Sequence, residues 1–149
     1  DIILDVVRSP MVRAEASGAE VLTGATDIAN ARLVFDNGCV ANVTASRVSA
    51  KKERRMRFFQ HDCYLAVDFQ ERRLTVHRKG EQEMYPGIPE LVTEEMRFES
   101  SDAIRDEIEA FITSIRSGVP PLVSGADGRR ALAAAIDITG RFGTALPGI

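Results

Sequence analysis

The sequence lacks tryptophan, has only 2 cysteines and 2 histidines, and contains no long apolar run. Cys39 and Cys63 make no disulfide framework, and they fit neither a common zinc spacing nor a redox pair. We therefore expect reduced thiols in a cytoplasmic protein. The longest apolar runs, such as Ala131–Ile136, are far too short to cross a bilayer, and no signal peptide opens the chain. These absences predict a protein that does not associate with a membrane.

The charge balance lacks a basic excess, since 22 acidic residues against 19 basic ones give a formal net charge of -3. A dedicated nucleic-acid binder usually shows a marked basic excess, so no nucleic-acid partner is expected. What is present is ordinary for a soluble globular protein: 149 residues, 44% of them hydrophobic and 28% charged. With no internal repeat and no long linker, this length predicts a single domain over residues 1–149.

Complete catalytic motifs are missing as well. Gly125 and Gly128 open a predicted helix, but the strand and turn of a dinucleotide-binding Gly-x-Gly-x-x-Gly motif do not precede them. The P-loop pattern is absent. One sequence does not exclude a Ser/His/Asp triad, but no serine lies in a nucleophile elbow. A metal site could be built from both cysteines and both histidines, but their spacing matches no known module, and we interpret them as strand and loop positions.

The chain opens at Asp1 with an apolar helical stretch, Ile2–Val7, that has no initiator Met and no capping lead-in. This opening predicts that the chain was cut from a larger protein. Ser9-Pro10 ends the helix, because proline disfavours helical geometry in the residue before it. A strand is predicted over Met11–Ala19.

The most definite local feature is a hairpin. Alternate residues from Ala29 to Phe35 share one face of a strand, and Asp36-Asn37-Gly38 follows. Asn-Gly readily supplies the positive φ angles of a tight turn, so Cys39–Val48 is predicted to return as the next strand. Further strands are predicted at Arg54–Gln60, Tyr64–Phe69 and Leu74–Arg78, then a loop over Lys79–Val92 and an edge strand at Thr93–Glu99.

Helices follow the strands. An apolar stripe predicts one helix over Asp102–Ser117, which Gly118 ends, and Ser124 with Asp127 resembles a capping box that starts the next helix, reaching Phe142. Consecutive strands followed by helices predict an α+β domain with one open, mostly antiparallel sheet that helices cover on one face. Leu65, Val67 and Phe69 are candidates for the covered side.

A basic segment over residues 47–57 carries six cationic side chains opposed only by Glu53. One interpretation is a solvated loop and edge strand. The other is an anion-facing rim, because guanidinium groups match phosphate and carboxylate geometry.

Several segments together resemble the C-terminal domain of the glucose–fructose oxidoreductase/inositol dehydrogenase/MocA family. Asp27–Gly38 resembles its D-x-A-x-A-x-(hydrophobic)-x-F-x-N-G hairpin, and Val40–Ser46 resembles the strand that follows. Gly118-x-Pro120 and Ser124–Leu132 resemble its closing helix pair. The opening Asp1-Ile2-Ile3-Leu4 looks like the helix after its H-D-I-D motif, with Asp1 as the second aspartate. The resemblance spans essentially the whole chain.

This resemblance implies a substrate-side and dimer-forming half of an enzyme whose N-terminal Rossmann domain, absent from this chain, binds NAD(P). The family's Glu-Lys-Pro lysine and its partner histidine lie outside the chain. Asp1 matches a position that binds substrate in some members, and the loop after the hairpin makes Arg47, Lys51 and Lys52 candidates for the same role. The sequence Ala45–Val48 looks most like enzymes that oxidise nucleotide-linked amino sugars. The resemblance thus implies a sugar or nucleotide-sugar substrate.

The open sheet face implies a homo-oligomer, with Tyr64, Ala66 and Val34 facing outward. Arg32, Asp68 and Arg73 on that face would then have to pair or lie at the rim, because unpaired buried charge is costly. The alternative from another class is a free-standing α+β binding or dimerisation module without enzymatic activity, which explains the missing catalytic motifs equally well. The fragment itself is expected to bind no cofactor and to catalyse nothing.

Overall fold

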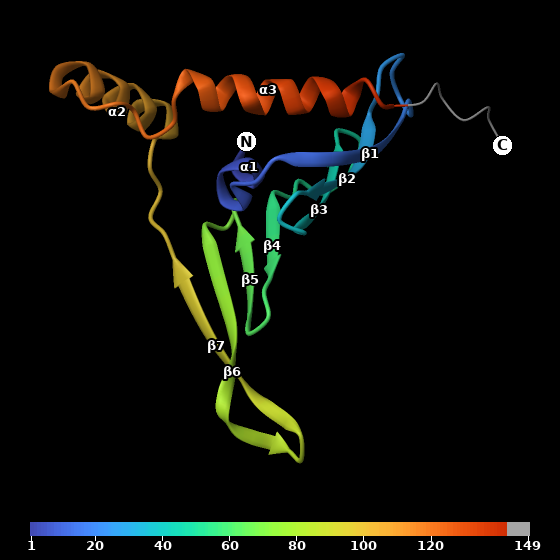
Figure 1. The fold of residues 1–149 in the computed structure, drawn as a ribbon, viewed down its shortest axis with the longest axis vertical. Coiled ribbons are helices and arrows are strands. Elements are labelled where there is room, and N and C mark those ends of the chain that lie inside the picture. The colour runs from blue at the N-terminus through green and yellow to red at the C-terminus, as the bar shows by residue number, and fades with distance from the viewer. Residues whose placement is uncertain (143–149) are drawn as a thin grey trace. The chain divides into compact units, whose positions relative to one another are not determined.

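The computed structural model of the protein describes residues 1–142, and Figure 1 shows its elements in chain order. Strands come first after a short helix, and longer helices follow. The elements are α1 (Ile2–Val7), β1 (Met11–Ala19), β2 (Ile28–Phe35), β3 (Val40–Ser46), β4 (Arg55–Phe59), β5 (Cys63–Asp68), β6 (Arg73–Tyr85), β7 (Ile88–Arg97), α2 (Ala103–Ser117) and α3 (Gly125–Thr139).

The strands confirm the predicted α+β class with antiparallel pairing, but they form two sheets where the sequence predicted one. The first sheet has the order β1-β2-β3 and the second the order β4-β5-β6-β7. Among the described residues β3 pairs with β2 and β4 pairs with β5, and no ladder joins β3 to β4, so the prediction of one sheet is corrected to two.

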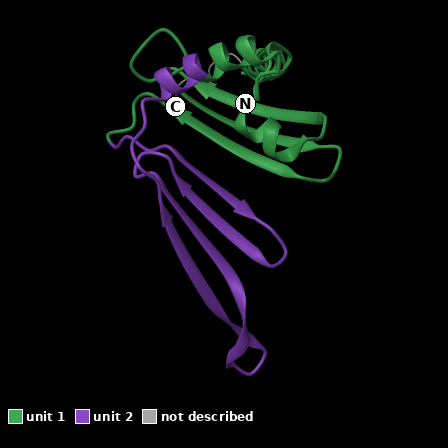
Figure 2. Cartoon of the chain, turned by 90° about the vertical axis from the view of Figure 1, so that its left-hand side faces the viewer, with its two compact units in different colours: residues 1–50, 110–149 green, residues 51–109 purple. Residues whose placement is uncertain are grey.

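The chain divides into two compact units, coloured separately in Figure 2. Unit 1 comprises residues 1–50 and 110–149, and unit 2 comprises residues 51–109. Unit 1 therefore contains the first sheet with α1 and α3, and unit 2 contains the second sheet. Each unit is described by itself.

The core of unit 1 lies on one face of its sheet. Alternation along β2 buries Ala31, Leu33 and Phe35, and Ala14 of β1 joins them. The apolar side of α1 and Ile138 of α3 pack against this cluster. The opposite face is polar and exposed: the Arg32 guanidinium donates to Asn42 Oδ1 at 3.2 Å, and the Thr44 hydroxyl donates to Asn30 Oδ1 at 2.9 Å.

The predicted hairpin is confirmed, but its turn differs. Gly38 has φ of 82°, whereas Asn37 does not have a positive φ. The N–H of Gly38 donates to the carbonyl of Phe35 at 2.9 Å, and the Asn37 side chain accepts from the N–H of Cys39 at 3.1 Å. A turn followed by one glycine with positive φ is typical of a three-residue hairpin connection. Asn37 therefore stabilises the turn through its side chain, and Gly38 alone adopts the left-handed backbone conformation.

Unit 2 contains a long hairpin that the sequence did not predict. The predicted loop over Lys79–Val92 is wrong, because β6 extends to Tyr85 and β7 begins at Ile88. Gly87, with φ of 78°, makes the turn between them. Pro89 is tolerated because β7 lies at the edge of the sheet among the described residues, and the register shifts between Lys79 and Tyr85 mark irregular pairing.

The two faces of the second sheet differ in character. Leu65 and Val67 share a face with Val76, which is 3% exposed and is the buried apolar residue of this sheet among the described residues. The other face carries a row of stacked rings from adjacent strands. Phe59 and Tyr64 have ring centroids 4.9 Å apart, and Tyr64 and His77 have centroids 5.2 Å apart.

Both long helices lie where the sequence predicted them. The capping box of α3 is confirmed: the Ser124 hydroxyl accepts from the N–H of Asp127, and the Asp127 carboxylate accepts from the N–H of Ser124 at 2.9 Å. Gly118 ends α2 with φ of 68°. Among the described residues, no helix is long and apolar enough to span a membrane.

Candidate functional site

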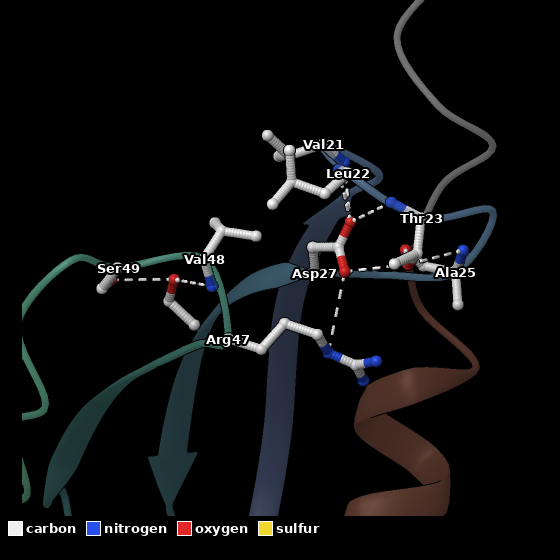
Figure 3. A network of polar contacts seen from close by, with 9 residues as sticks. Val21, Leu22, Thr23, Ala25, Asp27, Arg47, Val48 and Ser49 are labelled. Carbon is white, nitrogen blue, oxygen red and sulfur yellow. Dashed lines mark hydrogen bonds and ion pairs between the residues drawn. The ribbon is translucent and has the colours of Figure 1, made fainter.

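The densest polar network of unit 1 is centred on Asp27, which stands between the loop of residues 20–26 and β2 (Figure 3). Its Oδ2 atom accepts the backbone N–H groups of Val21, Leu22 and Thr23 at 3.0, 2.8 and 2.8 Å. Its Oδ1 atom accepts the Thr23 hydroxyl at 2.8 Å. The carboxylate thus takes the place of a backbone acceptor for a loop that has no strand partner.

The main chain of Asp27 joins three strands at the same point. Its N–H donates to the carbonyl of Ala19, which ends β1, at 2.9 Å. Its carbonyl accepts the N–H of Arg47, the residue after β3, at 2.9 Å. Arg47 therefore leaves the sheet from a fixed backbone position.

The side chain of Arg47 returns toward the same aspartate. Its Nε lies 3.7 Å from Asp27 Oδ1, and its side chain is 64% exposed while that of Asp27 is fully buried. Figure 3 shows the two terminal nitrogens of the guanidinium turned away from Asp27. Within residues 1–142 these terminal nitrogens form no ion pair, so they remain available to an anion.

The network keeps Asp27 ionised. The N–H groups of Val21, Thr23 and Leu22 hold the pKa of its carboxyl far below the ordinary value, against the opposing effect of burial. A permanent negative charge at Oδ1 favours one position of the Arg47 guanidinium over the many that an exposed arginine samples.

A cavity of about 780 Å³ adjoins this pair within unit 1. Its walls come from the start of β2, the end of β3 and α3, and most of the lining is apolar, with Ile28, Ile138 and Phe142 as the largest apolar side chains. Asp27, Ser46, Arg47 and Thr139 supply polar groups. An apolar cavity with few polar groups and one cation is the usual form of a small-molecule site.

The structure brings only one of the predicted substrate residues to this cavity. Arg47 lines it, whereas Asp1 lies at the N-cap of α1 without a side-chain capping bond and is not among the lining residues. Lys51 and Lys52 belong to unit 2. The Lys51 ammonium lies 3.3 Å from the carboxylate of Glu53, which also lies 3.6 Å from Arg55.

Unit 2 contains a second buried aspartate with a similar set of contacts. Asp68 Oδ1 accepts the N–H groups of Gln70 and Glu71 at 3.1 and 3.0 Å, and Oδ2 accepts Arg55 Nε at 2.9 Å. The Glu71 N–H contributes most to lowering the pKa of Asp68, and the hydrogen bond to Asp68 raises the pKa of Arg55. Neither residue lines the cavity of unit 1.

Among the described residues, the one helix N-terminus with a capping box does not fit the phosphate of a dinucleotide cofactor. The N-terminus of α3 is the nearest candidate, because helix N-termini bind phosphate groups. Its first turn is occupied by its own capping box, and the Asp127 carboxylate stands where a phosphate would lie; the Ser124 hydroxyl lowers the pKa of that carboxyl and keeps it charged. Residues 1–142 also contain no group of three potential metal ligands.

Sequence reasoning missed the part that Asp27 plays. Asp27 appeared only as the first letter of the hairpin motif, although a signal was present: an aspartate directly before a strand, after a Thr-Gly-containing loop, commonly accepts nearby backbone N–H groups. The cavity itself could not be predicted, because it depends on α3 approaching β2 and β3 from far along the chain.

The fold and the site together describe an α+β domain with open antiparallel sheets and a cavity in unit 1 that Arg47 and Asp27 line. No family model matches the chain. It is 37% identical over 138 residues to UDP-N-acetylglucosamine 3-dehydrogenase of Acidithiobacillus ferrooxidans, a match that covers 93% of the chain and 44% of that enzyme. The chain belongs to the glucose–fructose oxidoreductase/inositol dehydrogenase/MocA family, and it matches the C-terminal part of these relatives.

Solved structures agree. A structure of UDP-N-acetylglucosamine 3-dehydrogenase GnnA from the same organism superposes with a TM-score of 0.86 at 35% identity, over 95% of this chain and 45% of that one. Levoglucosan dehydrogenase in complex with NADH superposes with a TM-score of 0.69 at 14% identity, over 86% of this chain and 41% of that one, a likeness of fold alone. The chain spans less than half the length of these relatives.

Proposed function

We propose that the chain is the substrate-side and dimer-forming part of an NAD(P)-dependent oxidoreductase that oxidises a hydroxyl of a nucleotide sugar. The observation that carries the proposal is Arg47, fixed beside Asp27 at the margin of a largely apolar cavity. The similarity to UDP-N-acetylglucosamine 3-dehydrogenase across nearly the whole chain supports this class of substrate. UDP-N-acetylglucosamine is therefore the first substrate to test.

Within this proposal the chain binds and orients the sugar nucleotide. The cationic fork of Arg47 suits a diphosphate, because guanidinium and phosphate form paired, charge-assisted hydrogen bonds. Asp1, Lys51 and Lys52 are proposed as further substrate contacts. The cofactor belongs to the remainder of the protein, since the N-terminus of α3 is closed by its own cap. When bound there, NAD(P) supplies the hydride acceptor for the oxidation.

The test is a comparison of the whole protein with the isolated chain. The whole protein, given UDP-N-acetylglucosamine and either NAD or NADP, should form the reduced nicotinamide in proportion to the oxidised sugar. The isolated 149-residue chain should neither turn over the substrate nor bind NADH in a calorimetric titration. A whole protein that reduces no nicotinamide with any nucleotide sugar would contradict the proposal, and a micromolar NADH affinity of the isolated chain would contradict the division of roles.

The dimer is proposed through the face of the second sheet that carries Phe59, Tyr64 and His77. Phe59 is 76% exposed, Tyr64 and His77 are half-buried, and exposed apolar surface on a sheet commonly marks an interface. Two charged residues on this face already have partners within the unit, since Asp68 binds Arg55 at 2.9 Å and Arg73 lies 3.9 Å from Glu95. Burying Asp68 and Arg73 in a dimer interface would therefore leave less uncompensated charge than burying unpaired charged residues would.

Light scattering on the isolated chain tests the dimer. The monomer mass is 16.3 kDa, and we expect about twice this mass at micromolar concentration. Replacing the exposed ring in Phe59→Ser should shift the protein toward the monomer, while Val12→Ser on β1 of the other unit should not. A wild-type mass that stays at the monomer value on concentration would reject the dimer.

A further inference from the structure

We infer that Asp27 is a positioning residue for substrate binding: it fixes the Arg47 guanidinium so that its terminal N–H groups meet the diphosphate of the nucleotide sugar. The inference rests on the proposed function, and it assigns the recognition of phosphate to one pair of residues in unit 1. Asp27 itself touches no ligand in this account.

The carboxylate divides its two oxygens between two tasks. Oδ2 accepts the three backbone N–H groups of residues 21–23, and Oδ1 faces the Thr23 hydroxyl and Arg47 Nε. The first oxygen therefore secures the loop backbone, and the second accepts the Thr23 hydroxyl and also faces the arginine. Because the aspartate is buried and bonded at both oxygens, its own position is fixed before it acts on Arg47.

Fixing the arginine matters because this side chain is exposed. A mobile arginine loses conformational entropy when it binds an anion, and a partner that holds it in the binding geometry removes part of that loss. The contact through Nε leaves both terminal nitrogens directed outward, as Figure 3 shows. Paired N–H groups in one plane match two phosphate oxygens.

The negative charge of Asp27 does not cancel the attraction for a diphosphate. Three backbone N–H dipoles and one hydroxyl already point at the carboxylate and offset its charge. The buried Asp27 carboxylate is therefore partly neutralised, whereas the exposed Arg47 guanidinium keeps its full positive charge. Arg55 differs from Arg47 in both contacts. Its Nε lies 2.9 Å from the Asp68 carboxylate, and its Nη1 lies 3.6 Å from the Glu53 carboxylate.

A competing explanation is that Asp27 only holds the loop together. Asp27→Asn separates the two tasks, because asparagine has one acceptor and one donor group at its end. The backbone N–H groups of residues 21–23 require the acceptor at the Oδ2 position, so the amide NH₂ must occupy the Oδ1 position. There it faces Arg47 as a second donor. The loop keeps its backbone acceptor, the Thr23 hydroxyl can turn to accept from the amide, and the arginine loses its partner.

The experiment is a double-mutant cycle on the whole protein, with UDP as the titrated ligand and uridine as the ligand without phosphate. Arg47→Ala should weaken UDP binding by about 10- to 100-fold, the range for one charge-assisted contact, and leave uridine binding nearly unchanged. Asp27→Asn should weaken UDP binding in the wild-type background and have no further effect in the Arg47→Ala background, because it acts through that arginine.

Control substitutions show whether a loss of UDP binding is specific to Asp27 and Arg47 or follows from a general loss of folding. Asp68→Asn alters the corresponding aspartate of unit 2, and Arg13→Ala removes an exposed arginine of unit 1 that pairs with Glu15 and does not line the cavity. Both should bind UDP as the wild type does. If Asp27→Asn does not fold, Arg47→Lys replaces it in the test, because a lysine keeps the charge but offers no Nε contact and no planar fork; it should lose most of the UDP affinity.

The outcomes distinguish the two proposals. An Asp27→Asn effect that is equal in both Arg47 backgrounds, or an Arg47→Lys protein that binds UDP normally, would overturn the positioning role while the whole protein still oxidises UDP-N-acetylglucosamine. A wild-type protein that binds no UDP and reduces no nicotinamide would overturn the proposed function, and the positioning role with it.

Discussion

Each of the two units contains a buried aspartate paired with an arginine. In each, a buried aspartate divides its carboxylate between backbone N–H groups and an arginine: Asp27 with Arg47 in unit 1, and Asp68 with Arg55 in unit 2. In unit 2 the arginine is held tightly and has a second acidic neighbour. In unit 1 the contact is longer, the arginine has terminal N–H groups to spare, and a cavity lies beside it. The latter arrangement leaves a more exposed cation, and this cation lines a cavity.

The units also differ in how much core they contain. Unit 1 buries Ala14, Ala31, Leu33 and Phe35 in one cluster, whereas Val76 is the buried apolar residue of the second sheet among the described residues. A small sheet that buries little apolar surface has little intrinsic stability. The first unit is therefore suited to hold a site rigidly, and the second is suited to gain stability from a partner surface.

The largest expected effect of a substitution is in the core of unit 1. Phe35 is 1% exposed, and Phe35→Ala should lower the free energy of unfolding by about 3–5 kcal/mol. Val76→Ala, its counterpart in unit 2, should cost about 1.5 kcal/mol, because it removes about two methylene equivalents from a thinner core. Urea denaturation of both variants measures the difference, and equal losses would contradict the contrast between the cores.

Acid should destabilise both units through the two aspartates. Their folded pKa values lie below the ordinary 3.8, so the stability they contribute is fully present above that pH and is lost as the pH falls through and below it. Backbone N–H groups lower the pKa of Asp27, and the Glu71 N–H together with Arg55 lowers that of Asp68. Thermal melts from neutral pH to pH 2 should show a shallower dependence for Asp27→Asn than for the wild type; an unchanged slope would mean that Asp27 titrates normally.

The turn glycines give a smaller contrast. Gly38 and Gly87 both have positive φ, and a methyl group at either would meet open space. Alanine at Gly38 should lower the free energy of unfolding by about 1–2 kcal/mol, because a side chain strains the left-handed backbone conformation. The full cost should appear in global stability, since this turn closes the hairpin that forms the core. The same change at Gly87 should reduce global stability less, since the distal part of the β6–β7 hairpin is exposed and can open locally. Hydrogen exchange at the two turns distinguishes these cases.

How much of the fold the sequence predicted depended on whether the signal was local. Alternation along β2, the break at Pro10 and the Ser124–Asp127 cap depend on neighbouring residues, and each is confirmed. The β6–β7 hairpin was missed because Gly80, Pro86 and Pro89 are typical of loops, and only the edge position of β7 and its irregular pairing make them compatible with strands. The division into two sheets is a tertiary choice that no local pattern encodes.

The residues of the candidate site were also predictable only where their signal was local in the sequence. Arg47 was identified from a basic run and a family resemblance, and the structure places it at the cavity. Its neighbours in that run, Lys51 and Lys52, belong to the other unit. Asp27 was hidden because its importance comes from loop N–H groups and an arginine twenty residues later.

The most direct test of the account is the steady-state kinetics of the whole protein and its Arg47→Ala variant, with UDP-N-acetylglucosamine and with N-acetylglucosamine as substrates. An interaction made equally in the ground state and the transition state changes KM and leaves kcat unchanged. Arg47→Ala should raise KM for the nucleotide sugar by about 10- to 100-fold at constant kcat, and should leave the kinetics with the free sugar unchanged. Equal losses on both substrates, or no loss on UDP-N-acetylglucosamine, would contradict the account.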